Sequence, residues 1–220
     1  MTHRLALPLT LGVALLCAAA APTAQAGVVF TNFGPSLAYD TGSGNPVGNA
    51  FDGNDYAGGD AFTPSQTGVL SSLRLALSCA FGCADPFNVS LTADNGDQPG
   101  TVLENFTVQG TALGAFALNN PPLLLTSLVH PQLHLGTQYW VAISSPISDA
   151  ISWNLNTSGD SSDQAISTDG GATWFSPSGN TPSALEVSVA PAATTPEPGT
   201  LAFLLGGAML LALRRPVLSN

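Results

Sequence analysis

Basic side chains are almost missing from this chain. Its 220 residues include no lysine and only four arginines. Between residues 27 and 196, Arg74 is the single basic residue against eleven aspartates and two glutamates, a net charge of −12 with histidine neutral. A nucleic-acid-binding surface needs clustered Lys and Arg to neutralise phosphates. The composition therefore excludes nucleic acid as a partner.

Familiar catalytic motifs are missing too. The chain has no G-x-S-x-G elbow, no H-E-x-x-H pattern and no phosphate-cradling glycine loop. A glycosidase needs two carboxylates flanking a sugar, and Glu104 and Glu186 are the only glutamates between residues 27 and 190. Their spacing does not mark them as a pair. We therefore expect a protein that is not an enzyme, with a surface glycosidase as an alternative.

Helical periodicity is missing between residues 27 and 190. Short alternating or apolar runs occur instead, separated by clusters of Gly, Pro, Asn and Asp. The expected strands are Ala57–Phe62, Ser72–Leu77, Phe87–Thr92, Val102–Val108, Leu123–Leu128, Gln138–Ser144, Ala150–Asn154, Gln164–Ser167 and Ala184–Val189. This pattern predicts one all-β domain over 27–190, an antiparallel, jelly-roll-like β-sandwich of roughly nine to eleven strands in two sheets.

The first 26 residues have the organisation of a secretory signal peptide. Arg4 provides a positive start, Leu5–Ala21 is apolar, and Ala24 and Ala26 form a small-x-small cleavage site. We expect an apolar helix that is removed on export, so that the mature chain begins at Gly27.

A turn-rich segment separates the expected domain from the end of the chain. Residues 191–195 form a short low-complexity linker. Pro196 and Pro198, on either side of Glu197, then hold the backbone in an extended conformation that a protease can grip. The linker would keep this tripeptide clear of the domain.

An apolar run, Leu201–Leu213, follows and ends at Arg214 and Arg215, a pair that favours the cytoplasmic side of a membrane. As a helix, this run rises only about 20 Å, against a hydrocarbon core of about 30 Å. The expected transmembrane helix is short, and it suits transient insertion into the inner membrane better than a permanent span.

Residues 196–218 as a whole resemble the PEP-CTERM sorting signal of Gram-negative bacteria. Pro196, Glu197 and Pro198 match its motif, and the apolar run and the arginine pair match its helix and basic tail. The resemblance implies an exosortase-type membrane protease as a partner, and delivery to the cell surface or the exopolysaccharide matrix. An ordinary C-terminal membrane anchor is the alternative, and it implies the same export.

A second resemblance covers most of the segment between the two ends. Its ordered short motifs are Thr31–Pro35, Tyr39–Thr41, Ala61–Pro64, Leu70–Ser78, Asp94–Gly100, Asn120–Pro122, His130–Pro131, Gly136–Trp140 and Asp169–Trp174. In this order they resemble the choice-of-anchor R type of bacterial surface domain. That resemblance implies a secreted all-β domain and assigns no catalytic residue.

The run Ser167–Trp174 also fits the S-x-D-x-G-x-T-W pattern of the Asp-box in sialidases and related β-proteins. In this pattern Asp169 accepts hydrogen bonds across a hairpin turn, Gly171 permits positive φ, and Trp174 packs beneath. A single copy predicts a hairpin and no chemistry.

Cys79 and Cys83 lie close together in a chain that we expect to be exported, where neighbouring thiols oxidise. We expect them to form a disulfide that closes a tight surface loop. Free thiols are one alternative, and zinc bound together with His130 and His134 is another. Pro131 opposes zinc, because it breaks the helix on which the two histidines would share a face.

Acidic, glycine-rich loops are the candidate sites for a cation. The first set is Asp52, Asn54, Asp55 and Asp60, and the second is Asp94, Asn95 and Asp97. Both offer the oxygen ligands that Ca²⁺ prefers, although neither has EF-hand spacing. Turn formation explains the same residues without a metal. We expect no cofactor, with calcium at these loops as the open alternative.

Trp140, Trp153 and Trp174 are the candidate glycan contacts, since an exposed indole can stack on a sugar ring. Tryptophans in strands more often belong to the core. Our expectation is a non-catalytic structural or adhesion protein of the cell surface or biofilm matrix. The alternatives are a carbohydrate-binding module that contacts exopolysaccharide, and the surface glycosidase.

Overall fold

The computed structural model describes residues 27–145, 149–177 and 179–190, which form thirteen β-strands and two short 3-10 turns. The strands are β1 Gly27–Thr31, β2 Tyr39–Val47, β3 Ala57–Phe62, β4 Gly68–Leu75, β5 Leu77–Phe81, β6 Pro86–Asp94, β7 Pro99–Gln109, β8 Leu123–Thr126, β9 Gln132–Leu133, β10 Tyr139–Ser144, β11 Ala150–Asn156, β12 Gln164–Ser167 and β13 Leu185–Ala190. The 3-10 turns are η1 Pro35–Leu37 and η2 Gly110–Ala112. All-β structure is confirmed. The expected signal helix and C-terminal helix lie outside the described residues.

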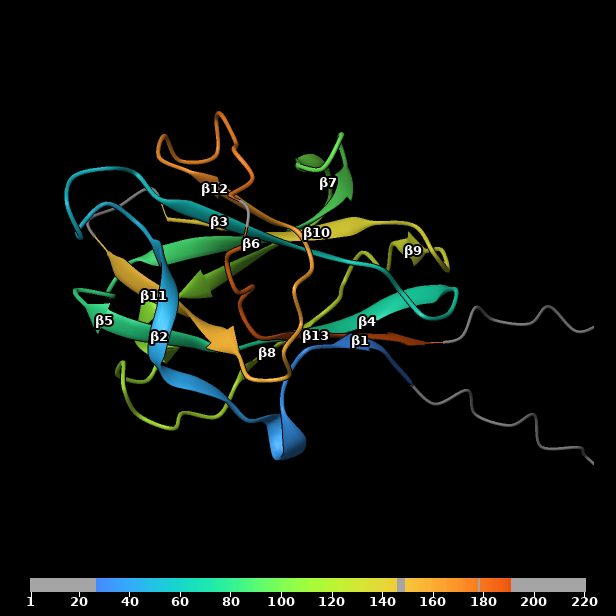
Figure 1. Ribbon diagram of the computed structural model, residues 1–220, viewed down its shortest axis with the longest axis horizontal. Coiled ribbons are helices and arrows are strands. Elements are labelled where there is room, and N and C mark those ends of the chain that lie inside the picture. Colours follow the sequence, from blue (N-terminus) through green and yellow to red (C-terminus); the bar gives the residue numbers. More distant parts are fainter. Residues whose placement is uncertain (1–26, 146–148, 178, 191–220) are drawn as a thin grey trace, which may run out of the picture.

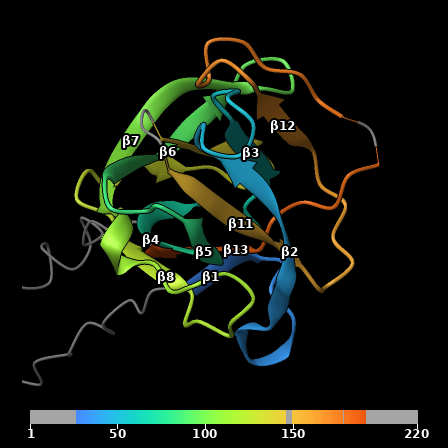
Figure 2. The ribbon, with the colours of Figure 1, turned by 90° about the vertical axis from the view of Figure 1, so that its left-hand side faces the viewer.

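These strands form three antiparallel sheets. Their orders are β1-β13-β4-β8 with β9 paired to β4, β12-β3-β10-β6-β7, and β2-β11-β5. Figure 1 shows the second of these, called the groove sheet below, above the β1-β13-β4-β8 sheet. The β2-β11-β5 sheet lies at one end of the molecule, which faces the viewer in Figure 2.

One apolar core joins the three sheets. It includes Leu73 of β4 and Val187 of β13, Val89 of β6 and Ile143 of β10, and Trp153 of β11. Side chains alternate between this core and the outside along β4, β6 and β13. That alternation is the signal from which these strands were predicted, because successive side chains of a strand point to opposite faces.

The expectation of two sheets is wrong, and the reason lies at Ala76. The sequence predicts one strand over Ser72–Leu77, but the chain leaves the first sheet after Leu75 and enters the third at Leu77. Ala76 itself donates its N–H to the Ala184 carbonyl and accepts a hydrogen bond from the Asn154 N–H. The alternating run Ser72–Leu77 carries no mark of such a change of partner strand.

Strand β2 was not predicted, because Gly42, Gly44 and Pro46 look like turn residues. It pairs only with β11, so it is an edge strand, where proline does not remove a ladder hydrogen bond from the sheet interior. Gly44 is also required for close packing, since a Cβ there would lie 2.1 Å from Ser152 Oγ.

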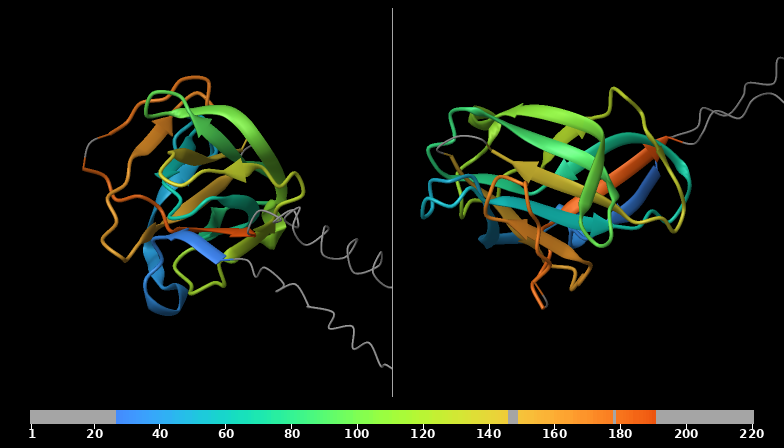
Figure 3. Two further views of the ribbon diagram at one scale, coloured as in Figure 1. Left: turned by 90° about the vertical axis from the view of Figure 1, so that its right-hand side faces the viewer. Right: turned by 90° about the horizontal axis from the view of Figure 1, so that it is seen from above.

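The two ends of the described domain lie side by side. Gly27 of β1 pairs with Val189 of β13 in an antiparallel ladder, and Figure 3 shows both strands meeting the same end of the molecule. The chain therefore enters and leaves the described domain at neighbouring positions.

Candidate functional site

One face of the groove sheet packs on the core and the other faces outward. Small residues occupy the centre of the outer face. On β10, Ile143 belongs to the core, whereas Ala142 and Ser144 alternate to the outer face. Ala142 is paired with Gly59 of β3 on one side and with Ser90 of β6 on the other. Small residues on three neighbouring strands leave this part of the face uncovered by their own side chains.

The Asp-box hairpin follows β12, the edge strand of the groove sheet (Figure 1), and it lines this part of the outer face with Gly170, Gly171 and Trp174. Asp169 Oδ1 accepts hydrogen bonds from the Thr173 N–H at 2.8 Å and the Ser167 hydroxyl at 2.7 Å, and Asp169 Oδ2 accepts one from Thr173 Oγ1 at 2.6 Å. These bonds, led by that of the Thr173 hydroxyl, lower the pKa of Asp169 to about 2, so the carboxylate is ionised at neutral pH. Gly170 and Gly171 take φ of 73° and 96°, as the turn requires.

Trp174 lies on the groove sheet over Gly59. A Cβ at Gly59 would come within 2.8 Å of Pro99 Cγ and 3.6 Å of Trp174 Cζ3. The missing side chain therefore lets Pro99 and Trp174 approach the backbone of β3. Trp174 packs there against Trp140 and keeps part of its surface exposed.

The hairpin is tied to the β6–β7 turn that carries Pro99. Gln98 Nε2 donates a hydrogen bond to the Trp174 carbonyl at 3.2 Å, and Ser176 Oγ donates one to the Asp97 carbonyl at 3.2 Å. The turn itself is held by Asp94, whose Oδ1 accepts the Asp97 N–H at 3.1 Å. Two loops far apart in sequence are thereby fixed relative to each other.

A hollow of about 210 Å³ opens between these loops and the sheet. Its lining residues come from β6, β7, β10 and the hairpin: Ser90, Thr92, Pro99, Gly100, Val102, Ala142, Ile143, Ser144, Gly170, Gly171 and Trp174. The lining combines one indole with three hydroxyl side chains and contains no ionisable group. Such a mixture suits an uncharged ligand with an apolar face and polar edges.

Thr92 lines this hollow and carries a hydroxyl oxygen that is enclosed by the protein. It lies between Trp140 of β10 and Val102 of β7, it is only 3 % exposed, and its Oγ1 has no hydrogen-bond partner among the described residues. Leaving a buried hydroxyl unpaired costs on the order of 1–3 kcal/mol. A ligand oxygen would recover that cost once the Thr92 side chain turned its hydroxyl toward the hollow, because Thr92 Oγ1 is enclosed by the protein in this structure.

A polar strip continues from the hollow along β6 and β7. Ser90 Oγ donates to Asn105 Oδ1 at 2.8 Å, Asn105 Nδ2 donates to Asn88 Oδ1 at 3.3 Å, and Thr107 Oγ1 donates to the same Asn88 oxygen at 3.3 Å. These four residues, called the polar strip below, are uncharged and line one face of the two paired strands.

Two of the three candidate glycan contacts are wrong. Trp140 and Trp153 have 0 % exposed surface, so neither indole can meet a sugar. Trp140 packs beneath the hairpin and donates its Nε1–H to Asp94 at 2.8 Å, and Trp153 lies in the core and donates to the Ala184 carbonyl. Trp174 alone remains a candidate.

The first calcium set does not form one site. Asp60 is 1 % exposed and accepts hydrogen bonds from the Ser183 N–H at 2.9 Å and Gln164 Nε2 at 3.2 Å, whereas Asp52 is exposed and accepts one from the Tyr56 hydroxyl. Asp60 belongs to the inward face of β3, which sequence spacing does not reveal.

The remaining calcium candidates serve as turn residues. The Asn54 N–H donates to Asp52, Asp55 pairs with Asp169 in a single backbone bridge, and Asp94 organises the turn that contains Asn95 and Asp97. No group of three or more His, Cys, Asp or Glu side chains within the described ranges is arranged to hold a metal ion.

Cys79 and Cys83 are joined by a disulfide, the pairing that their spacing predicts. Their sulfurs are therefore not available as zinc ligands, and the zinc alternative is wrong. His130 Nδ1 instead lies 3.1 Å from the Leu70 carbonyl, and the His134 N–H donates to the Tyr139 hydroxyl at 3.1 Å.

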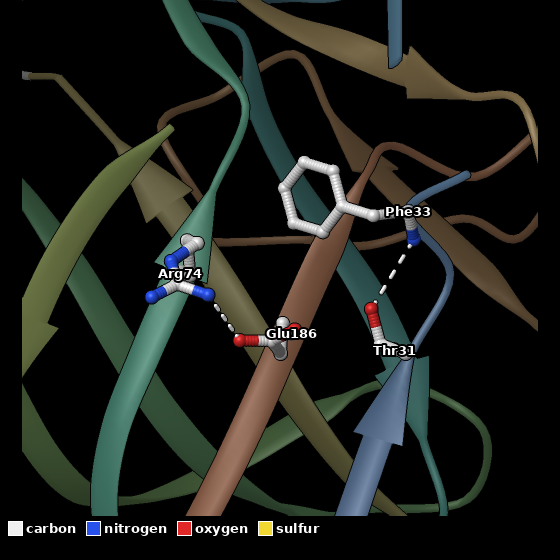
Figure 4. Close-up of polar contacts among 4 residues, drawn as sticks. All are labelled: Thr31, Phe33, Arg74 and Glu186. Atoms are coloured by element: carbon white, nitrogen blue, oxygen red, sulfur yellow. Dashed lines mark hydrogen bonds and ion pairs between the residues drawn. The ribbon is translucent and has the colours of Figure 1, made fainter. Parts of the chain in front are cut away.

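Glu104 and Glu186 lie in different sheets and each has its own partners. Glu104, 3 % exposed, accepts hydrogen bonds from the Ser127 hydroxyl and the Leu128 N–H, both at 2.6 Å. Glu186 of β13 forms an ion pair with Arg74 of the neighbouring β4, as Figure 4 shows. Neither carboxylate lines the hollow beside Trp174.

Sequence reasoning found Trp174 but missed the rest of the hollow. Thr92, Ser90 and Ser144 are ordinary strand residues, and Gly59 was included only as part of the strand Ala57–Phe62. Their common location follows from the pairing of β6 and β3 with β10, for which the local sequence contains no signal.

The predicted processing residues other than Gly27 lie outside the described residues. These are Ala24, Ala26, Pro196, Glu197, Pro198, Arg214 and Arg215. Among the residues that the structure describes, no helix has the length and apolar character needed to cross a membrane. Comparison of the chain with protein-family models, curated proteins and solved structures yields no match.

Proposed function

We propose that this chain is an exported, non-catalytic structural or adhesion protein of the cell surface or exopolysaccharide matrix of a Gram-negative bacterium. It would consist of a jelly-roll-like β-sandwich delivered by its signal peptide and sorted through a PEP-CTERM tail. The observation that carries this proposal is the pairing of Gly27 with Val189, because it brings together the strands next to the two expected processing sites.

This arrangement supports processing at both ends. Every described strand lies between Gly27 and Ala190, so removing residues 1–26 or cutting near Pro196–Gly199 would take away none of them. The Cys79–Cys83 disulfide agrees with export, since disulfides persist outside the reducing cytoplasm. A protease such as exosortase would meet the Glu197 tripeptide beyond Ala190, where the last described strand ends.

Replacing Glu197 tests the sorting step. In the native host, the Glu197→Ala variant should keep its apolar tail, because the protease would no longer find a carboxylate between Pro196 and Pro198. Intact mass and C-terminal sequencing of the surface protein measure this. The expected wild-type terminus lies near Pro196–Gly199, with Arg214 and Arg215 removed.

Thr200→Ala is the matched control, because it changes a neighbouring polar residue outside the Pro-Glu-Pro tripeptide. It should mature like the wild type. If Glu197→Ala is processed normally, or if wild-type surface protein keeps its arginine pair, the tail is a plain anchor and the sorting proposal fails.

A further inference from the structure

Trp174 is the only tryptophan in this chain with exposed surface, and it borders a hollow rather than open solvent. A pyranose ring has an apolar face that packs on an indole and a rim of hydroxyls that need hydrogen-bond partners. Ser90 and Thr92 of β6 and Ser144 of β10 line the same hollow as Trp174. The hollow therefore offers both contacts that one sugar unit requires.

The unpaired hydroxyl of Thr92 points to a ligand independently of the shape. Two neighbouring polar groups have partners: Ser90 bonds to Asn105, and Asp169 accepts the hydrogen bonds of the hairpin. Thr92 Oγ1 alone among the lining hydroxyls is buried without one in the described structure. A sugar hydroxyl can both donate to and accept from such a group.

The charge around the hollow selects the class of sugar. Arg74, the only Lys or Arg between residues 27 and 190, is paired with Glu186 in the opposite sheet. The hairpin beside the hollow carries ionised Asp169. Proteins normally recognise a carboxylated or sulfated sugar through Arg or Lys. The negative charge beside this hollow would repel such a sugar.

We propose that the hollow beside Trp174 binds one neutral hexose unit of a polysaccharide, with the adjoining polar strip contacting the next unit. Trp174 stacks on the sugar face, and Thr92, Ser90 and Ser144 bind its hydroxyls. This inference deepens the proposed function by naming the matrix component, and it rests on the proposal that the chain resides in that matrix.

The test compares binding of neutral and acidic polysaccharide. The mature protein, purified from its native host, is titrated with two fractions of the host exopolysaccharide, one neutral and one rich in uronic acid. We expect saturable binding of the neutral fraction and at least tenfold weaker binding of the acidic fraction, measured by calorimetry. Binding should also protect Trp174 fluorescence from acrylamide, because the other two indoles are already buried.

Two variants assign the binding to the hollow. Trp174→Ala removes the stacking surface and should weaken binding at least tenfold. Ala142→Leu fills the floor of the hollow without removing a hydrogen bond, so it should have the same effect with an unchanged melting temperature. Thr126→Leu is the control, since it places the same leucine side chain at an exposed position of β8 in the other sheet.

The inference is overturned if the wild type binds no neutral fraction, if it binds the acidic fraction equally well, or if Ala142→Leu binds like Thr126→Leu. These outcomes are independent of tail processing. Normal maturation of Glu197→Ala would refute the sorting proposal and leave the binding result standing, and loss of sugar binding would leave the sorting result standing.

Discussion

Asp60 is the residue whose chemistry depends most on the fold. Burial, and to a smaller extent the negative charge of Asp160, raise the pKa of Asp60 to about 7. Hydrogen bonds from Ser183 and Gln164 act in the opposite direction and lower this pKa. A carboxyl in an unfolded chain titrates near 3.9. Between about pH 4 and pH 7 the folded state therefore binds more protons than the unfolded state, and this contribution to stability is lost as the pH rises through that window.

Asp60→Asn should remove this pH dependence, because asparagine keeps an acceptor for Ser183 and carries no charge. Shifting a pKa by three units corresponds to on the order of 4 kcal/mol. We expect urea denaturation to show the wild type losing stability between about pH 4 and pH 7, and the variant losing clearly less. Asp163→Asn, at an exposed neighbouring position, is the control. Identical pH slopes for wild type and Asp60→Asn would contradict the assignment.

At the scale of elements, local signals worked where a strand or turn is self-contained. The strands Ala57–Phe62 and Gln164–Ser167 match their predicted bounds, and the Asp-box hairpin has the predicted hydrogen bonds. Prediction failed where partner strands decide the outcome, as for edge strand β2 and for the change of sheet at Ala76. Edge position and sheet membership are properties of pairing, not of composition.

The Cys79–Cys83 disulfide stabilises only a local element. It closes a loop of sequence separation 4, and a loop that short constrains the unfolded chain modestly. Replacing both cysteines by serine should lower the free energy of unfolding by about 1–2 kcal/mol in a urea titration. The reduced wild type should show the same loss. A loss several times larger would show that the disulfide holds β5 to the core.

At the scale of the whole molecule, the β1–β13 pairing brings the two ends of the described domain together. A chain covering residues 27–195 should melt at the same temperature as the full chain, since all described strands are retained. A chain ending at Ser183 should not fold, because it lacks β13, which lies between β1 and β4 and buries Leu185, Val187 and Val189. Circular dichroism melting curves of both would test this. Destabilisation of the 27–195 chain would show that the tail belongs to the fold.

The amino-acid sequence by itself determined the all-β class, the strongly acidic surface and the hairpin at Asp169, because each follows from residue type and short-range spacing. It also carries the predictions about both ends of the chain. Only the tertiary structure decided which residues are inside. It buried Trp140, Trp153 and Asp60, and it brought the Gln98 side chain to Trp174, 76 residues away. Such contacts depend on which strands pair and which face a loop covers, and no local pattern encodes that choice.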